Sequence, residues 1–159
     1  MSVPFEIRDA REVDVAAVNA VIAAAIDTWD LPARVKRLAL PMYRYTQEDL
    51  GHLTIRVVEQ TSSIVAVAAW EPANPRDLTG RVSGVLLHGL YVDPIHQRQG
   101  FATRLLADGA DAARARGDDG ILVRAQADAE GYFTRLGFER LPIRDEARDY
   151  AKRLWLSLS

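Results

Sequence analysis

The segment that most constrains the fold is Val85–Val92, which is apolar along almost its whole length. A strand of this kind is typical of a sheet that is covered on both faces. Asp93-Pro94 follows it, and Pro94 stops the strand before a helical pattern begins near Thr103. The chain also contains strand–helix–strand units and a hairpin. This order predicts an α/β (mixed α+β) fold in which helices flank a mixed sheet.

Periodicity predicts the elements around this strand. Apolar residues at three- and four-residue steps indicate helices, and β-branched runs indicate strands. Asp9 is the expected N-cap of the first helix. In the second helix Val35, Leu38 and Met42 share one side, and Pro41 is expected to break it. We expect strands at 3–8, 54–59, 64–70, 85–92, 121–125, 138–141 and 153–158, and helices at 10–25, from 33 onward, at 103–116 and at 129–136.

Composition bounds the class of protein. The length of 159 residues and the 48% hydrophobic content predict one globular domain over residues 1–159. The formal charge of -2 argues against a sequence-independent nucleic-acid binder, and the absence of cysteine excludes disulfides and a cysteine nucleophile. The residues from Met1 to Phe5 lack a signal-peptide pattern. The most apolar stretch, Val18–Ile26, is too short to span a bilayer, so we expect a cytoplasmic protein.

The turn after the buried strand carries the clearest chemical signal. Gly100 and Ala102 are small residues at a helix start, where backbone N–H groups can face one anion. Arg98 and Arg104 would add salt-sensitive attraction for a phosphate. The alternative is an ordinary helix start after a glycine turn. The chain has neither a Gly-x-x-x-x-Gly-Lys-Ser/Thr loop nor a Gly-x-Gly-x-x-Gly motif after a strand.

Several segments resemble one family in order and spacing. Gln97-Arg98-Gln99-Gly100-Phe101-Ala102 matches the Gln/Arg-x-x-Gly-x-Gly/Ala signature of the GNAT (GCN5-related N-acetyltransferase) superfamily. Leu90–Pro94 resembles its fourth strand and turn, and Ala129–Phe138 is similar to its Ala-x-x-Phe-Tyr-x-x-x-Gly-Phe segment. Ile7–Ala10 followed by Asp14 resembles its opening strand and helix. Together these segments cover most of the chain.

The resemblance implies a GNAT-like central mixed, mostly antiparallel sheet of roughly 6–7 strands flanked by about four helices, with strands 4 and 5 splayed. It implies acetyl-CoA as co-substrate, with the pyrophosphate on backbone N–H groups of the loop and the pantetheine arm paired with the fourth strand. We expect no metal. The cofactor-binding residues that it assigns are Leu90, Tyr91, Val92, Gln97, Arg98, Gln99, Gly100, Phe101, Ala102, Thr103, Gln126 and Phe133.

The resemblance also implies an N-acetyltransferase in which an amine attacks the thioester directly, so a base must accept a proton. Many family members use a carboxylate near the fourth strand, and Val85–Val92 has none. His88 is our candidate base because an imidazole titrates near neutral pH. The alternative is a wall histidine bonded to the backbone. Gly89 indicates either a bulge that supplies an oxyanion donor or simple relief of crowding.

The acid that would protonate the leaving thiolate is a departure from the family pattern. Phe133 stands at the position of the family's tyrosine, and Tyr132 precedes it. Neighbouring helical residues point about 100° apart, so Tyr132 does not simply replace that tyrosine. We take Tyr132 as the candidate catalytic tyrosine. The alternatives are that water or a tyrosine elsewhere protonates the thiolate, and that Tyr132 lines the CoA or acceptor site or packs beneath the helix.

The acceptor is expected to be an amine of a small molecule or peptide. An aromatic wall and nearby acids are its expected contacts: Trp29, Tyr43, Tyr45, Trp70, Asp30, Glu48 and Asp49. We expect no nucleic-acid or membrane partner, and the sequence allows a homodimer. His52, His88 and His96 lack the paired spacing of a metal site. The rival interpretation is a non-catalytic acyl-CoA-binding or regulatory module with the same fold, and a third is a protein-interaction domain.

Overall fold

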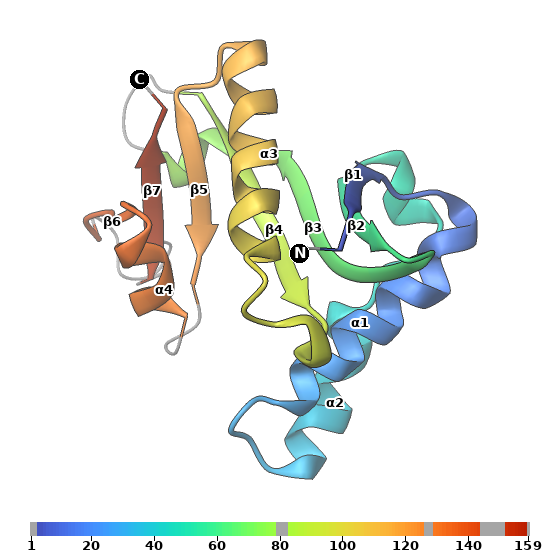
Figure 1. Cartoon of the computed structure of the whole chain (residues 1–159). Helices are drawn as coiled ribbons and strands as arrows, with labels where there is room; N and C mark the ends of the chain where they lie inside the picture. The colour runs from blue at the N-terminus through green and yellow to red at the C-terminus, as the bar shows by residue number, and fades with distance from the viewer. Residues whose placement is uncertain (1–2, 79–82, 126–128, 144–151, 159) are drawn as a thin grey trace. The chain divides into compact units, whose positions relative to one another are not determined.

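The computed structural model describes residues 3–78, 83–125, 129–143 and 152–158 of the chain. The strands in these residues are β1 (Phe5–Asp9), β2 (Thr54–Gln60), β3 (Ser63–Pro72), β4 (Gly84–Val92), β5 (Gly120–Arg124), β6 (Glu139–Arg140) and β7 (Arg153–Ser157). The α-helices are α1 (Val15–Asp27), α2 (Ala33–Tyr43), α3 (Phe101–Arg116) and α4 (Glu130–Arg135) (Figure 1).

The strands form one sheet in the order β1-β2-β3-β4-β5-β7-β6. β4 and β5 run parallel, whereas β1–β2, β5–β7 and β6–β7 are antiparallel pairs. The prediction of a mixed, mostly antiparallel sheet with helices is therefore confirmed, and each strand begins and ends within two residues of its predicted limits. Within the described residues, each helix is too short or too polar to cross a bilayer.

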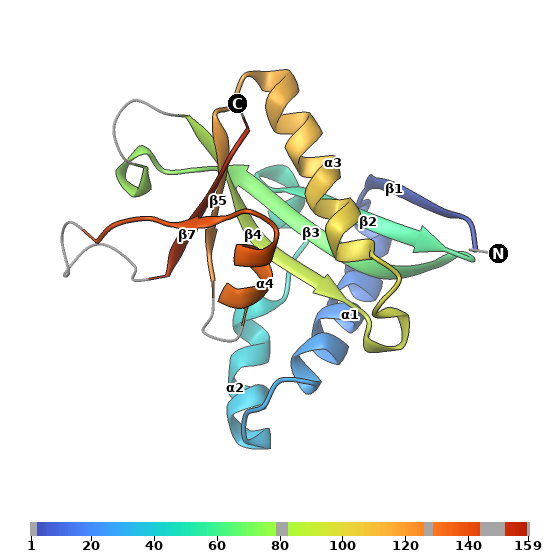
Figure 2. The same cartoon turned by 60° about the vertical axis from the view of Figure 1, so that its left-hand side comes forward.

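The chain divides into two compact units. The first comprises Met1–Ala69 and Gly89–Asp108, and the second comprises Trp70–His88 and Gly109–Ser159. The first unit thus contains β1, β2, α1, α2, most of β3, the end of β4 and the first half of α3. The second unit contains the β4–β5 and β5–β7 ladders, and Figure 2 shows its strand β7 next to α4.

The hairpin of β2 and β3 follows from its turn. Thr61 and Ser62 connect the strands, and both have positive φ angles, 51° and 63°. Two left-handed residues in succession are typical of the two-residue turn whose twist matches that of the flanking strands. The predicted hairpin is therefore confirmed, with a turn that the residue types alone did not specify.

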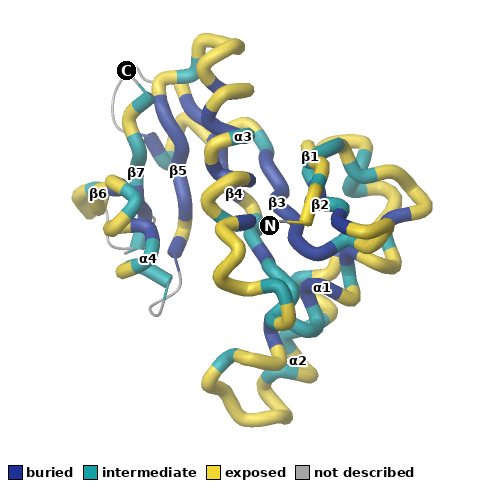
Figure 3. Tube along the Cα trace, in the orientation of Figure 1, coloured by how far each residue is buried: buried dark blue, intermediate teal, exposed yellow. Residues whose placement is uncertain are grey.

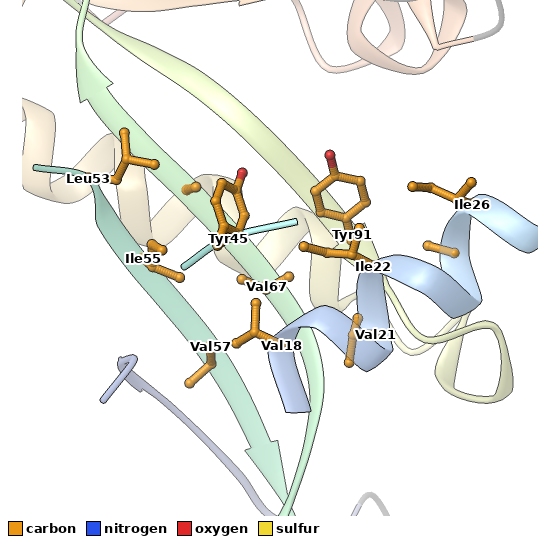
Figure 4. Packing of buried hydrophobic residues seen from close by; sticks show 12 residues of the cluster. Val18, Val21, Ile22, Ile26, Tyr45, Leu53, Ile55, Val57, Val67 and Tyr91 are labelled. Atoms are coloured by element: carbon orange, nitrogen blue, oxygen red, sulfur yellow. The ribbon is translucent and has the colours of Figure 1, made fainter. Parts of the chain in front are cut away.

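The core of the first unit forms where α1 packs against the sheet (Figure 4). Val18, Ile22 and Ile26 are buried there, as their spacing predicts. The predicted cap of this helix is wrong. The carboxylate of Asp14, not Asp9, accepts a hydrogen bond from a backbone N–H in this turn, that of Arg11, at 2.8 Å. Asp9 instead pairs with a guanidinium from β2, which removes it from the helix start.

α2 departs from its prediction at Pro41. The helix continues through this residue to Tyr43, and the N–H of Arg44 still donates to the carbonyl of Leu40 at 3.2 Å. Because Pro41 stands near the C-terminal end, little of the hydrogen-bond ladder is lost. Leu40 and Tyr43 pack against the core. The side shared by Val35, Leu38 and Met42 is exposed, so this apolar stripe does not face the core (Figure 3).

Candidate active site

The second half of β4 offers backbone to a ligand. The ladder with β5 joins Gly84–Leu87 to Gly120–Val123, and β4 continues to Val92 beyond it. In the described ladder, Leu90–Val92 therefore have no partner on β5. Backbone N–H and C=O groups on such a strand edge can accept another extended chain. This is the geometry that the resemblance requires for a pantetheine arm.

The register between β3 and β4 changes by one residue along the pair. The N–H of Ala73 donates to the carbonyl of Gly84, and that of Asp93 donates to the carbonyl of Val65, both at 2.9 Å. Between these bonds β3 advances eight residues and β4 advances nine. One extra residue on one strand defines a β-bulge. β4 is therefore bulged between Gly84 and Asp93, the interval that contains Gly89.

Tyr91 presents its side chain to the core of the first unit. It is buried in the cluster that contains α1, and burial raises the pKa of its phenol, with a further contribution from Tyr43. Strand alternation places Leu90 and Val92, which are half-buried, on the opposite face. The part of Tyr91 that a cofactor could reach on the strand edge is its backbone.

The loop after β4 is fixed at its first end. The carboxylate of Asp93 accepts a hydrogen bond from the N–H of Ile95 at 3.1 Å and caps the 3₁₀ turn Pro94–His96. Arg98 and Gly100 then adopt the left-handed region, with φ of 68° and 79°. When left-handed and right-handed residues follow one another, successive backbone N–H groups converge on a concave surface that binds anions. An ideal Cβ at Gly100 would have no described atom within 4 Å, so this surface is open.

The loop is anchored at its other end by the first turn of α3. Phe101 is 3% exposed and packs edge-to-face on Phe5, with ring centroids 5.3 Å apart. The guanidinium of Arg104 lies 5.0 Å from the centre of the Phe5 ring. Ala102 and Thr103 complete this turn, which contains no acidic residue. The first N–H groups of a helix have no partner within the helix and carry partial positive charge, so this end of α3 favours an anion.

The candidate catalytic residues have contrasting environments. His88 on β4 is exposed. The hydroxyl of Tyr132 on α4 is buried and has no hydrogen-bond partner within the described residues. Phe133 is 6% exposed and packs edge-to-face on Phe138 at 5.3 Å, so it belongs to the core of the second unit. Gln126, assigned to the cofactor arm, lies outside the described residues.

The structure brings together only part of the expected acceptor wall. Trp29 and Tyr43 are in edge-to-face contact at 5.5 Å, and both pack on the core cluster that holds Tyr45. Trp70 lies instead against α3 in the second unit. Asp49 accepts a hydrogen bond from the N–H of Thr46 at 2.7 Å, so it has a local structural role. Asp30 and Glu48 are exposed.

Two residues that support the site are not evident from the sequence. Gln60, 7% exposed, donates to the side chain of Gln99 at 3.5 Å and links β2 to the loop. Asn19 of α1 makes two hydrogen bonds to the backbone of Tyr45. The only signal for Asn19 was its position as a polar residue inside the apolar stretch Val18–Ile26. In the described residues, no three His, Asp or Glu side chains are grouped to hold a metal ion.

The comparison with family models decides the family. Residues 36–150 match the model described as acetyltransferase (GNAT) domain. The chain belongs to the GNAT acetyltransferase family. The match contains β4, the loop and α3, so the GNAT signature proposed from sequence lies inside it. No curated protein matches the chain in sequence.

Solved GNAT structures have the same fold. A GNAT family acetyltransferase from Brucella melitensis in complex with acetyl-CoA aligns with a TM-score of 0.68 and 19% identity over 99% of this chain and 90% of that chain. The GNAT family N-acetyltransferase YhbS from Escherichia coli in complex with CoA aligns with a TM-score of 0.68 and 20% identity, over 100% of this chain and 84% of that chain. The ribosomal-protein-S18-alanine N-acetyltransferase from Escherichia coli aligns with a TM-score of 0.65 and 18% identity, over 98% of this chain and 95% of that chain.

Proposed function

We propose that this GNAT protein transfers the acetyl group of acetyl-CoA to the nitrogen of a primary amine, and that residues 1–159 act as one acetyltransferase domain. The observation that carries the proposal is the loop before α3, where Arg98 and Gly100 are left-handed and the surface above Gly100 is open. Backbone N–H groups from Arg98 to Thr103 would hold the pyrophosphate. The family match and the CoA-bound relatives support this use of the loop.

The second half of β4 would hold the reacting end of the cofactor. The pantetheine arm pairs with Leu90–Val92, where the strand has no partner in the described β5 ladder. This direction leads the thioester toward Gly89. A bulged residue can direct its N–H away from the ladder, and such a donor stabilises the negative charge that develops on the thioester oxygen. The one-residue excess in β4 supports this assignment.

The transfer needs one base and one acid. The neutral amine attacks the carbonyl carbon, a C–N bond forms, the C–S bond breaks and CoA leaves as a thiolate. His88 would accept the proton that the amine loses, directly or through water. Tyr132 would give a proton to the thiolate. A buried hydroxyl without a partner costs about 1–3 kcal/mol, so the Tyr132 hydroxyl fits a role in which the bound substrate or water supplies its partner.

The acceptor is proposed at the level of its chemistry, as an amine on a small molecule or a protein. Family relatives differ in this respect: one similar structure is an alanine N-acetyltransferase for ribosomal protein S18, and another was solved with acetyl-methionyl-tRNAfMet. The experiment is to mix the protein with acetyl-CoA and a broad panel of amines and to follow free thiol. We expect thiol release that depends on the amine. Absence of such release across the panel contradicts the proposed catalysis.

A second candidate function is acyl-CoA binding without turnover. Phe133 occupies the family's tyrosine position and is buried in the core, which favours this alternative. Calorimetry separates the two functions. Acetyl-CoA binding together with no amine-dependent turnover favours the binding module, whereas failure to bind any CoA species contradicts both.

The base can be tested by His88→Gln with His52→Gln as its control. His52 is also an exposed histidine, and it is not itself assigned to the cofactor or to the acceptor. We expect His88→Gln to lower turnover more than acetyl-CoA affinity and to change the pH–rate profile, and His52→Gln to change neither. An unchanged profile in His88→Gln rejects the assignment.

A further inference from the structure

Two tyrosine side chains occupy the space beside Gly89. An ideal Cβ at this position would lie 2.6 Å from the hydroxyl oxygen of Tyr45 and 2.8 Å from Cε2 of Tyr91. Real Cβ atoms do not approach other atoms so closely, so the phenols stand where a side chain at residue 89 would be. Both tyrosines are buried, at 4% and 9% exposure. Figure 4 shows their hydroxyls pointing to the same side of the strands.

Asn19 fixes the position of Tyr45. Its Oδ1 accepts a hydrogen bond from the Tyr45 N–H at 2.9 Å, and its Nδ2 donates to the Tyr45 carbonyl at 2.8 Å. One side chain of α1 therefore satisfies both backbone groups of a residue that lies outside any helix or strand. A two-point bond of this kind restricts where the Tyr45 ring can lie. The contact with Gly89 is thereby tied to a rigid helix.

We infer that Asn19 and Tyr45 are positioning residues that hold the backbone of β4 at Gly89 in the conformation that acetyl transfer requires. This inference rests on the proposed function, in which the Gly89 N–H faces the thioester oxygen. Glycine is the most flexible residue, so an unsupported Gly89 in a bulge would sample several backbone conformations. The Tyr45 hydroxyl fills the space into which that backbone would otherwise move. Displacement of about 1 Å at a reacting centre can lower a rate by roughly 10²-fold.

The test compares Tyr45→Phe with Thr28→Val. Tyr45→Phe removes only the atom nearest the space beside Gly89. Thr28→Val removes an exposed hydroxyl at the end of α1, which donates to the carbonyl of Ala25 and is not assigned to the cofactor or the acceptor. We expect Tyr45→Phe to lower kcat roughly tenfold, a part of the loss that misplacement can cause, with no change in the KM for acetyl-CoA. Thr28→Val should retain the wild-type kcat. A wild-type kcat in Tyr45→Phe overturns the inference.

Asn19→Ala shows whether Asn19 acts through Tyr45. The effect of Asn19→Ala on kcat should vanish in the Tyr45→Phe background, because both changes release the backbone of β4 at Gly89. Its effect on thermal stability should persist in that background. Additive effects on kcat overturn the role of Asn19. Wild-type protein without amine-dependent thiol release contradicts the proposed function itself, and the positioning role with it. If the wild-type protein is active and Tyr45→Phe has the same kcat, only the inference about Tyr45 and Asn19 is contradicted.

Discussion

The indole ring of Trp70 lies directly against the backbone of α3 at Gly109, where an ideal Cβ would be 2.1 Å from Cζ2 and 2.5 Å from Cε2 of the ring. No side chain fits in this space without movement of the ring or the helix. Glycine inside a helix usually costs about 1 kcal/mol relative to alanine. Close packing of α3 on the sheet at Trp70 accounts for its presence here.

Gly109→Ala should therefore destabilise the protein although alanine is the better helix former. Overpacking of a buried contact typically costs about 1–3 kcal/mol, which exceeds the gain in helix propensity. The control is Gly131→Ala on α4, where an ideal Cβ would meet only the Arg135 guanidinium at 3.7 Å. We expect a lower melting temperature for Gly109→Ala and an equal or higher one for Gly131→Ala. The same sign for both variants contradicts this account of Gly109.

Asp14 should make the free energy of unfolding depend on pH in the acidic range. The Arg8 guanidinium bonds its carboxylate at 2.7 Å and 3.0 Å, and this hydrogen bonding holds the pKa of Asp14 below its ordinary value. A carboxyl with a lowered pKa in the folded state stabilises the protein above its unfolded pKa and loses that contribution as the pH falls through the folded value. Asp14→Asn should thus lower the free energy of unfolding at pH 7 by about 1–3 kcal/mol.

The difference in the free energy of unfolding between Asp14→Asn and wild type should shrink as the pH is lowered below the ordinary pKa range of carboxyl groups. Urea unfolding at several pH values measures it. Asp111→Asn is the control, because that carboxylate is 81% exposed and its ion pair with Arg114 should contribute almost nothing. A pH-independent loss in Asp14→Asn would mean that shape, not charge, accounts for the effect.

Tyr91 should resist ionisation in alkaline solution. Burial raises the pKa of its phenol above the ordinary value, so the folded protein is penalised once the pH exceeds the unfolded pKa of about 10. Tyr91→Phe removes this penalty and should retain its fold to a higher pH than wild type. Circular dichroism together with phenolate absorbance follows both events. Identical alkaline unfolding of the two proteins contradicts the buried, neutral state of Tyr91.

The elements that sequence predicts correctly are those whose signals are local. The β-branched runs of β2 and β3 and the apolar run of β4 set the strands without help from distant residues. The errors have non-local causes. Asp9 fails as a cap because it is the last residue of β1, where it lies opposite Arg56 of β2, and the first helical turn begins only at Glu12. The apolar stripe of α2 faces outward because Leu40 and Tyr43 pack on the core instead.

The candidate site likewise has features that the local sequence predicts and features that only the folded structure shows. The small residues before α3 predict the loop. Nothing in the residue type marks Arg98 as left-handed, since that conformation usually favours glycine. The sequence marks Gly89 only as a glycine inside an apolar strand. Its neighbour Tyr45 is distant in sequence, and only the folded structure brings the two together. The roles of His88 and Tyr132 depend on the acceptor and stay predictions.

Gly100→Glu tests the phosphate loop, with Gly117→Glu as its matched control. Both glycines have positive φ, 79° and 85°, and at both an ideal Cβ meets nothing within 4 Å. Each substitution therefore carries the same backbone penalty, about 1–2 kcal/mol.

Only Gly100→Glu places a negative charge over the proposed pyrophosphate site, so it alone should lose acetyl-CoA affinity. Calorimetry should show a loss of tenfold or more, since ~1.4 kcal/mol of repulsion suffices. Gly100→Asn, uncharged and tolerant of this conformation, should bind nearly as wild type. Equal affinity in Gly100→Glu and wild type rejects the loop as the anion site, and equal loss in both glutamate variants attributes the effect to the fold.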